Sequence, residues 1–180
     1  MNDLDSQCLD RFPEWLQTLG EDAARLAAVV DDATAPEAVR RYAVGSLNYL
    51  FKSLDLISDG IEDLGFIDDA FVLRVAASLS LEASPEAGAH TATLAPLAED
   101  AKLIRALLDG IYPRLEAYVE RLQTGTARGR SVNDILSDEA IRRDFLNEVA
   151  GWAVSYEPPI FARDEKNLVK LKSFLTAQLP

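Results

Sequence analysis

The chain has 180 residues, of which 48% are hydrophobic and 27% charged, the composition of an ordinary globular protein. A chain of this length buries about 70% of its extended surface on folding, so it needs no disulfides or structural metals. The single cysteine, Cys8, excludes an internal disulfide and fits a reducing compartment. The acidic N-terminus lacks a secretory signal, and the apolar run 42–51 is shorter than the about 20 residues that span a bilayer. We therefore expect a soluble cytoplasmic protein.

The net charge is −12, and it is unevenly distributed along the chain. Residues 1–113 hold 8 basic and 20 acidic residues, whereas residues 114–180 hold 10 of each. An acidic surface of this kind repels nucleic acid and anionic lipid, so we expect no nucleic-acid partner. It suits cations or a basic partner, and the alternative is that the acidity serves solubility alone.

Apolar residues recur at helical spacing along almost the whole chain. The first stripe covers residues 12–30 and predicts a helix with Pro13 in its first turn. A second helix is predicted to begin at Pro36 and to end before Gly60. A third is predicted over residues 67–81, where the sequence is apolar nearly all round, which is typical of a central, buried helix.

The second half of the chain continues the helical pattern. Residues 84–93 have the composition of a loop, and Thr93 is predicted to cap a fourth helix. Residues 124–131, TGTARGRS, are predicted to be a flexible link between an N-terminal helical domain, residues 1–123, and a C-terminal helical segment, residues 132–180. We expect the two to pack as one unit. With no alternating strand pattern, the sequence predicts an all-α fold: an irregular bundle of about six to eight helices around an acidic helix–turn–helix element.

Residues 54–73, LDLISDGIEDLGFIDDAFVL, combine six acids with apolar residues and contain no Lys or Arg. The acids are Asp55, Asp59, Glu62, Asp63, Asp68 and Asp69. Asp68 and Asp69 fall at the start of the third predicted helix, where carboxylates accept free backbone N–H groups and oppose the helix dipole. Asp55 falls near the C-terminal end of the second predicted helix, where a negative charge is unfavourable. Asp55 therefore calls for another explanation.

A chain that doubles back between these helices brings Asp55 and Asp59 close to Asp68 and Asp69. Two carboxylates about 6 Å apart repel by roughly 3 kcal/mol at an effective dielectric constant of about 20, so such a cluster must be compensated. It can hold a proton, pair with a basic residue or bind a divalent cation. The candidate basic partners are Arg40, Arg41, Lys52 and Arg74. We expect Asp55 and one of the Asp68–Asp69 pair to tie the two helices together through backbone N–H groups or an arginine.

A bound divalent metal ion is the alternative explanation of the acidic cluster to helix caps and ion pairs. Because its ligands would all be oxygens, the site would favour Mg²⁺, Mn²⁺ or Ca²⁺ over Zn²⁺. The candidate ligands are Asp55, Asp59, Asp68 and Asp69. Structural caps and ion pairs account for the same residues without any required cofactor.

The order of these residues resembles the signature of the YkvA-like family, which has no firmly assigned activity. The resemblance covers residues 36–82. It is carried by Leu50, the run Asp55-Leu56-Ile57, Asp59 and the run Leu64-Gly65-Phe66-Ile67-Asp68-Asp69. It implies a helix–acidic turn–helix unit whose structural motif consists of Asp55, Asp59, Gly65, Asp68 and Asp69.

The chain departs from the family pattern where the family usually has proline. Those positions are held here by Ser53 or Leu54, by Ser58 and by Glu62. Because proline stiffens the backbone, its absence implies a connection that is longer, more helical or more mobile. Some members of the family look membrane-associated, so membrane contact is implied here by analogy alone.

The sequence contains no standard catalytic set. His90 is the only histidine and falls in the predicted loop, which argues against His-based triads and multi-histidine zinc sites. Cys8 has no evident base that could activate it as a nucleophile. These observations disfavour the common hydrolytic mechanisms.

Two functions remain in competition. The first is a non-catalytic interaction or scaffold module, which would use its acidic surface to bind an unidentified basic protein or a second copy of the chain. The second is a divalent-metal-dependent hydrolase of a phosphoester or pyrophosphate. Its metal ligands would be Asp55, Asp59, Asp68 and Asp69. We favour the first function.

Overall fold

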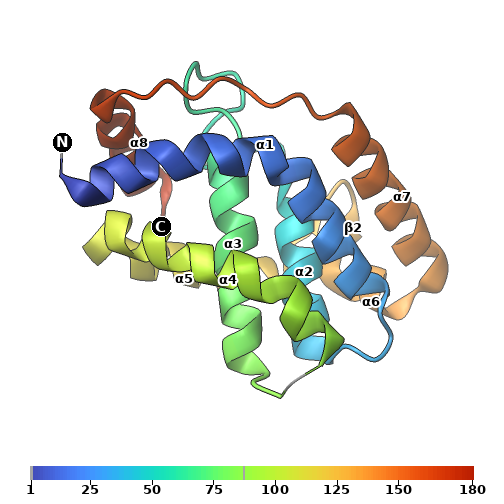
Figure 1. The fold of residues 1–180 in the computed structure, drawn as a ribbon. Helices are drawn as coiled ribbons and strands as arrows, with labels where there is room; N and C mark the ends of the chain where they lie inside the picture. Colours follow the sequence, from blue (N-terminus) through green and yellow to red (C-terminus); the bar gives the residue numbers. More distant parts are fainter. Residues whose placement is uncertain (1, 87) are drawn as a thin grey trace.

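The computed structural model describes residues 2–86 and 88–180 and has the all-α fold that the sequence predicts (Figure 1). The α-helices are α1 (Asp3–Asp31), α2 (Glu37–Tyr49), α3 (Ile67–Ala83), α4 (Ala89–Leu108), α5 (Tyr112–Leu122), α6 (Val132–Ser137), α7 (Glu139–Ser155) and α8 (Glu165–Gln178). A 3-10 turn, η1 (Asp109–Ile111), joins α4 to α5, and two short strands, β1 (Thr126–Ala127) and β2 (Arg130–Ser131), follow α5.

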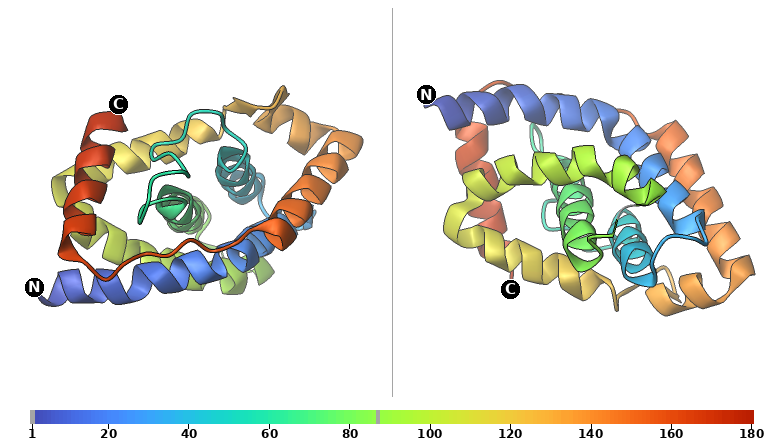
Figure 2. Two further views of the ribbon diagram at one scale, coloured as in Figure 1. Left: turned by 90° about the horizontal axis from the view of Figure 1, so that it is seen from above. Right: turned by 60° about the horizontal axis from the view of Figure 1, so that its bottom comes forward.

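The third helix, α3, lies at the centre of the molecule, as its sequence predicts. It packs against α1, α2, α4 and α5. Seen from above, α2 and α3 run nearly end-on through a ring formed by the other long helices (Figure 2). All residues from 67 to 77 are buried. Because buried charges are costly unless they are paired or neutralised, Asp68, Asp69 and Arg74 of this helix each need compensation within the protein.

The first helix begins earlier than predicted. It starts at Asp3, with the side chain of Asn2 as its cap, so Pro13 lies inside the helix and does not mark its first turn. An internal proline costs about 3 kcal/mol because it removes a helical hydrogen bond. Cys8 and Leu9 are fully buried and continue the apolar stripe toward the N-terminus. Burial of this extended stripe outweighs the cost of the proline.

The start of α4 also differs from the prediction. The helix begins at Ala89, so Thr93 lies within it and is not its cap. The first turn is closed by the Gly88 N–H group, which donates to Thr91 Oγ1 at 3.3 Å. His90, which the sequence placed in a loop, lies in this first turn and is buried.

Residues 124–131, predicted to be a flexible link, form a tight β-hairpin in which β1 and β2 pair antiparallel. The turn residues Arg128 and Gly129 have φ angles of 49° and 75°, the left-handed backbone of a two-residue hairpin turn. Asn48 Nδ2 donates to the Arg130 carbonyl at 3.3 Å and ties the hairpin to α2. The prediction of a flexible link is therefore wrong.

The chain after the hairpin packs along α1. A Cβ atom on Gly20 would lie 2.9 Å from the Ala153 carbonyl oxygen, so glycine permits the close crossing of α1 and α7. The Tyr156 hydroxyl donates to the Leu16 carbonyl at 2.9 Å. From there the chain runs beside α1 to α8 (Figure 1). Within residues 2–86 and 88–180, no helix has both the length and the apolar character needed to cross a membrane.

Candidate functional site

The acidic stretch forms a loop, residues 50–66, that joins α2 to α3 through consecutive turns (Figure 1). Because α2 ends at Tyr49, Asp55 lies in this loop and not near a helix end as predicted. The loop folds closely on itself at Gly65, where a Cβ atom would fall on the carbonyl oxygen of Asp59. Glycine is the residue that allows this approach of two backbone segments.

Asp68 anchors the loop to the start of α3. Its Oδ2 accepts hydrogen bonds from the Tyr49 hydroxyl at 2.5 Å and from the Ile57 N–H group at 3.1 Å. The Tyr49 hydroxyl in turn accepts from the Leu56 N–H group at 2.7 Å. All of these groups are buried. One carboxyl and one phenol thus join the end of α2, the loop and the start of α3, the role that the sequence predicted for a carboxylate of this motif.

The buried acids favour their protonated forms. Burial raises the pKa of Asp68 to about 7, although the Tyr49 hydrogen bond partly opposes the shift. Burial and the neighbouring Asp68 raise the pKa of Asp69 well above its usual range. Among the described residues, Asp68 Oδ1 and Asp69 Oδ2 have no hydrogen-bond partner. Protonation lowers the cost of burying these groups, because a neutral carboxyl is less costly to bury than a carboxylate.

The two loop acids lie closer to the surface. Asp55 is partly buried and Asp59 is exposed. Burial, followed by the charge of Asp59, raises the pKa of Asp55 to about 6. Although the Asp59 side chain is exposed, desolvation by the neighbouring protein atoms also raises its pKa. The charges of Asp55 and Asp59 also contribute to the raised pKa of Asp69, so the four acids lie within electrostatic range of one another. Within the described ranges, however, no group of three or more His, Cys, Asp or Glu is placed to hold a metal ion.

The basic residues predicted to compensate the acids are engaged elsewhere. Lys52 Nζ lies 3.2 Å from the Tyr118 hydroxyl and 5.9 Å from the centre of the Tyr49 ring. Burial lowers the pKa of this lysine, while Asp55 opposes the shift. The three candidate arginines bond to other groups, so of the two expected ties, backbone N–H groups or an arginine, the structure shows the first.

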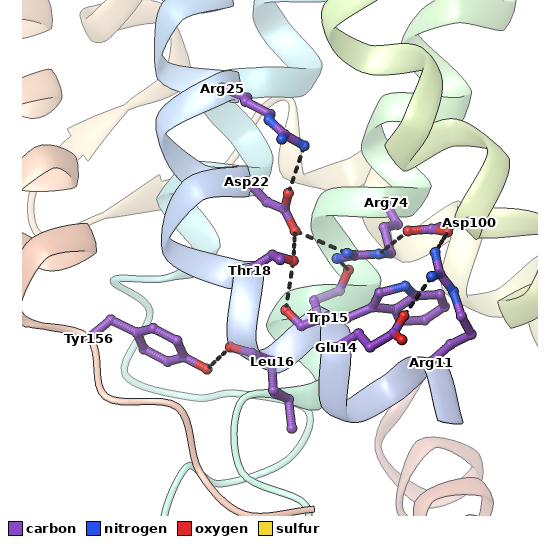
Figure 3. Close-up of polar contacts among 11 residues, drawn as sticks. Arg11, Glu14, Trp15, Leu16, Thr18, Asp22, Arg25, Arg74, Asp100 and Tyr156 are labelled. Atoms are coloured by element: carbon purple, nitrogen blue, oxygen red, sulfur yellow. Dashed lines mark hydrogen bonds and ion pairs between the residues drawn. The ribbon is translucent and has the colours of Figure 1, made fainter. Parts of the chain in front are cut away.

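A second polar cluster lies on the other side of α3, where Arg74 joins three helices (Figure 3). Arg74 is 2% exposed, and its guanidinium reaches Asp22 of α1 at 3.0 Å and Asp100 of α4 at 3.1 Å. It also lies over the ring of Trp15, 4.4 Å from the ring centre. At the edges, Arg11 pairs with Asp100 and Arg25 pairs with Asp22. The charges alternate and satisfy one another, which makes the cluster a structural tie.

Neither Tyr49 nor the partners of Arg74 were predicted as members of a site, although the sequence contains a signal for the partners of Arg74. Arg74 lies in a helix that is apolar nearly all round, so it needs a buried carboxylate. Asp22 lies between Leu19 and Ala23 on the buried stripe of α1 and is the matching acid. No comparable signal distinguishes Tyr49 from a core aromatic residue.

The described site offers little for covalent chemistry. The Cys8 thiol is buried, and burial together with nearby Asp5 raises its pKa to about 12, which opposes formation of a thiolate. His90 is buried away from the loop, in the first turn of α4. The loop therefore presents carboxyl groups without a partner nucleophile among these candidates.

Comparisons with protein-family models, with curated proteins and with solved structures yield no match to this chain. The YkvA-like resemblance over residues 36–82 thus stays a prediction from the residues alone.

Proposed function

We propose that the protein is a non-catalytic interaction module whose acidic loop, residues 50–66, binds a basic segment of a partner protein in the cytoplasm. The observation that carries the proposal is a set of loop carboxylates that have no ion pair among the described residues. They are Asp55, Asp59, Glu62 and Asp63. Beside them, Leu54 is 82% exposed and offers an apolar contact. Acidic side chains around an exposed leucine complement a peptide that alternates basic and apolar residues.

The loop gathers these four acids within one short segment. Some acids elsewhere are matched within the chain, as in the ion pairs of Asp10 with Arg163, Glu116 with Arg105 and Glu148 with Arg130.

The buried hydrogen bonds of Asp68 and Tyr49 also fix the loop to the protein core. A partner would therefore meet a pre-ordered surface, which reduces the entropy cost of binding.

The first test measures affinity with a defined probe. A fluorescent peptide of alternating Lys and Leu is titrated with the protein, and anisotropy is recorded at 50 and 300 mM salt. The Asp59→Lys, Glu62→Lys variant is expected to bind at least about tenfold more weakly, because opposite charges become like charges. Wild-type affinity is expected to fall with salt, since exposed charges are screened.

The matched control makes the same change of net charge at two acidic residues outside the loop. Glu82 and Glu86 are exposed near the other end of α3, and Glu82→Lys, Glu86→Lys alters net charge equally. An equal loss of affinity in both variants would show non-specific attraction to an anionic protein. Light scattering on the same samples tests the alternative of self-association, in which the wild type would form a dimer that the loop variant lacks.

A further inference from the structure

A second candidate site lies at the opposite end of α2 from the acidic loop. It is a cavity of about 520 Å³ between the α1–α2 connection, the first turns of α2 and α6. That volume is in the range of small-molecule sites, about 300–1,000 Å³. Its polar lining consists of Glu37, Arg40, Arg41, Asn133 and Ser137. Arg40 and Arg41 give this lining two positive charges on a chain with a net charge of −12.

Both arginines are held in place by bonds that leave part of each guanidinium free. Arg40 Nε donates to the Val30 carbonyl at 3.0 Å. Arg41 Nε donates to Glu37 at 2.9 Å, and its Nη1 donates to Asn133 Oδ1 at 2.8 Å. A guanidinium fixed through Nε presents its terminal nitrogens as a fork, the geometry that binds two oxygens of one anion.

The positive charge of the cavity is not balanced within the described chain. Arg40 has no carboxylate partner there, and its Nε donates to a backbone carbonyl. The one acid of the lining, Glu37, already pairs with Arg41. The two guanidinium groups of the lining therefore share one carboxylate.

We propose that this cavity binds the phosphate group of a small phosphorylated molecule, with Arg40 as the principal contact and Arg41 and Asn133 beside it. A phosphate dianion matches the unbalanced charge, and its oxygens match the arginine fork. Because the cavity and the acidic loop lie at opposite ends of a 13-residue helix, about 20 Å apart along its axis, the two proposals stand or fall independently.

The test uses inorganic pyrophosphate as the probe and isothermal titration calorimetry at constant ionic strength. The wild type is expected to bind it saturably with one site. Arg40→Gln is expected to weaken binding at least about tenfold, since a charged donor pair is lost. The matched control is Arg121→Gln, which removes the same charge from an exposed position on α5 and is expected to leave binding unchanged.

Arg40 also anchors α2 to α1, so a second variant separates binding from folding. Ser137 is exposed at the edge of the cavity, and Ser137→Glu places a carboxylate there without removing the Arg40 anchor. This variant is expected to abolish pyrophosphate binding while keeping the wild-type melting temperature. Absence of saturable binding to the wild type, or equal loss in Arg121→Gln, would overturn the proposal.

Discussion

Replacing Tyr49 by Phe tests the anchor beneath the acidic loop. The change removes only the hydroxyl oxygen, which donates to Asp68 and accepts from the Leu56 N–H group. Both partners are buried. Asp68 Oδ2 loses one hydrogen bond but keeps the bond from the Ile57 N–H group, a loss of about 0.5–1.5 kcal/mol, whereas the Leu56 N–H group is left unpaired, which costs about 1–3 kcal/mol. The two losses together predict a destabilisation of about 1.5–4.5 kcal/mol, a large part of the 5–15 kcal/mol typical of a whole domain.

Urea unfolding at pH 6, followed by circular dichroism, measures this difference as a shift of the midpoint. The control is Tyr156→Phe, which removes a single hydroxyl bond to the Leu16 carbonyl from a half-buried ring. That variant is expected to lose only about 0.5–1.5 kcal/mol. If Tyr49→Phe costs no more than Tyr156→Phe, the hydroxyl is not the tie between α2, the loop and α3, and the description of the anchor is wrong.

Three further predictions concern charge. The stability of the wild type relative to an Asp68→Asn, Asp69→Asn variant should fall as pH rises from about 4 to about 7, because the native chain keeps protons that the unfolded chain releases. The shift of the Asp68 pKa from 3.8 to about 7 corresponds to a loss of stability on the order of 4 kcal/mol over this pH range. Urea midpoints measured across the range would contradict the prediction if the wild type became more stable relative to the variant as pH rises. Arg74→Met should cost about 3–5 kcal/mol because it removes the buried partner that Asp22 and Asp100 share and leaves them only Arg25 and Arg11 at the edges of the cluster, with partial recovery in Arg74→Met, Asp22→Asn by the same assay. Thermal melts with EDTA, Mg²⁺, Mn²⁺ or Ca²⁺ decide the metal hypothesis: an interaction module shows no shift, whereas a rise at sub-millimolar ion that Asp55→Asn abolishes establishes a site.

The helical periodicity predicted the main helices because a helix that buries one apolar face has apolar residues at a regular spacing in its sequence. The central position of α3 followed from the same signal. The start of α1 could not be placed, because a proline is a local signal that burial of Cys8 and Leu9 overrides. The hairpin at 128–129 was missed although Arg128-Gly129 fits a two-residue turn, because its strands have only two residues each.

In the candidate site, too, the contacts implied by local sequence signals were predicted and the long-range contacts were not. Asp68 was correctly expected to meet backbone N–H groups, since the doubling back of the chain is implied by its turn residues. Its bond to Tyr49 and the pairing of Arg74 with Asp22 depend on which helix faces touch. Residue spacing alone does not decide such long-range contacts, so Arg74 remained one of four candidate basic partners of the acidic stretch.

The central claim is that the acidic loop is a docking surface, and its most direct test is a map of where a basic peptide binds. Amide and methyl chemical shifts of the ¹⁵N, ¹³C-labelled protein are recorded during titration with the Lys–Leu peptide. The claim predicts shifts concentrated at residues 53–63, including the Leu54 methyls, with a single affinity. Shifts spread evenly over the acids of α1 and α4, or no shifts at all, would contradict it.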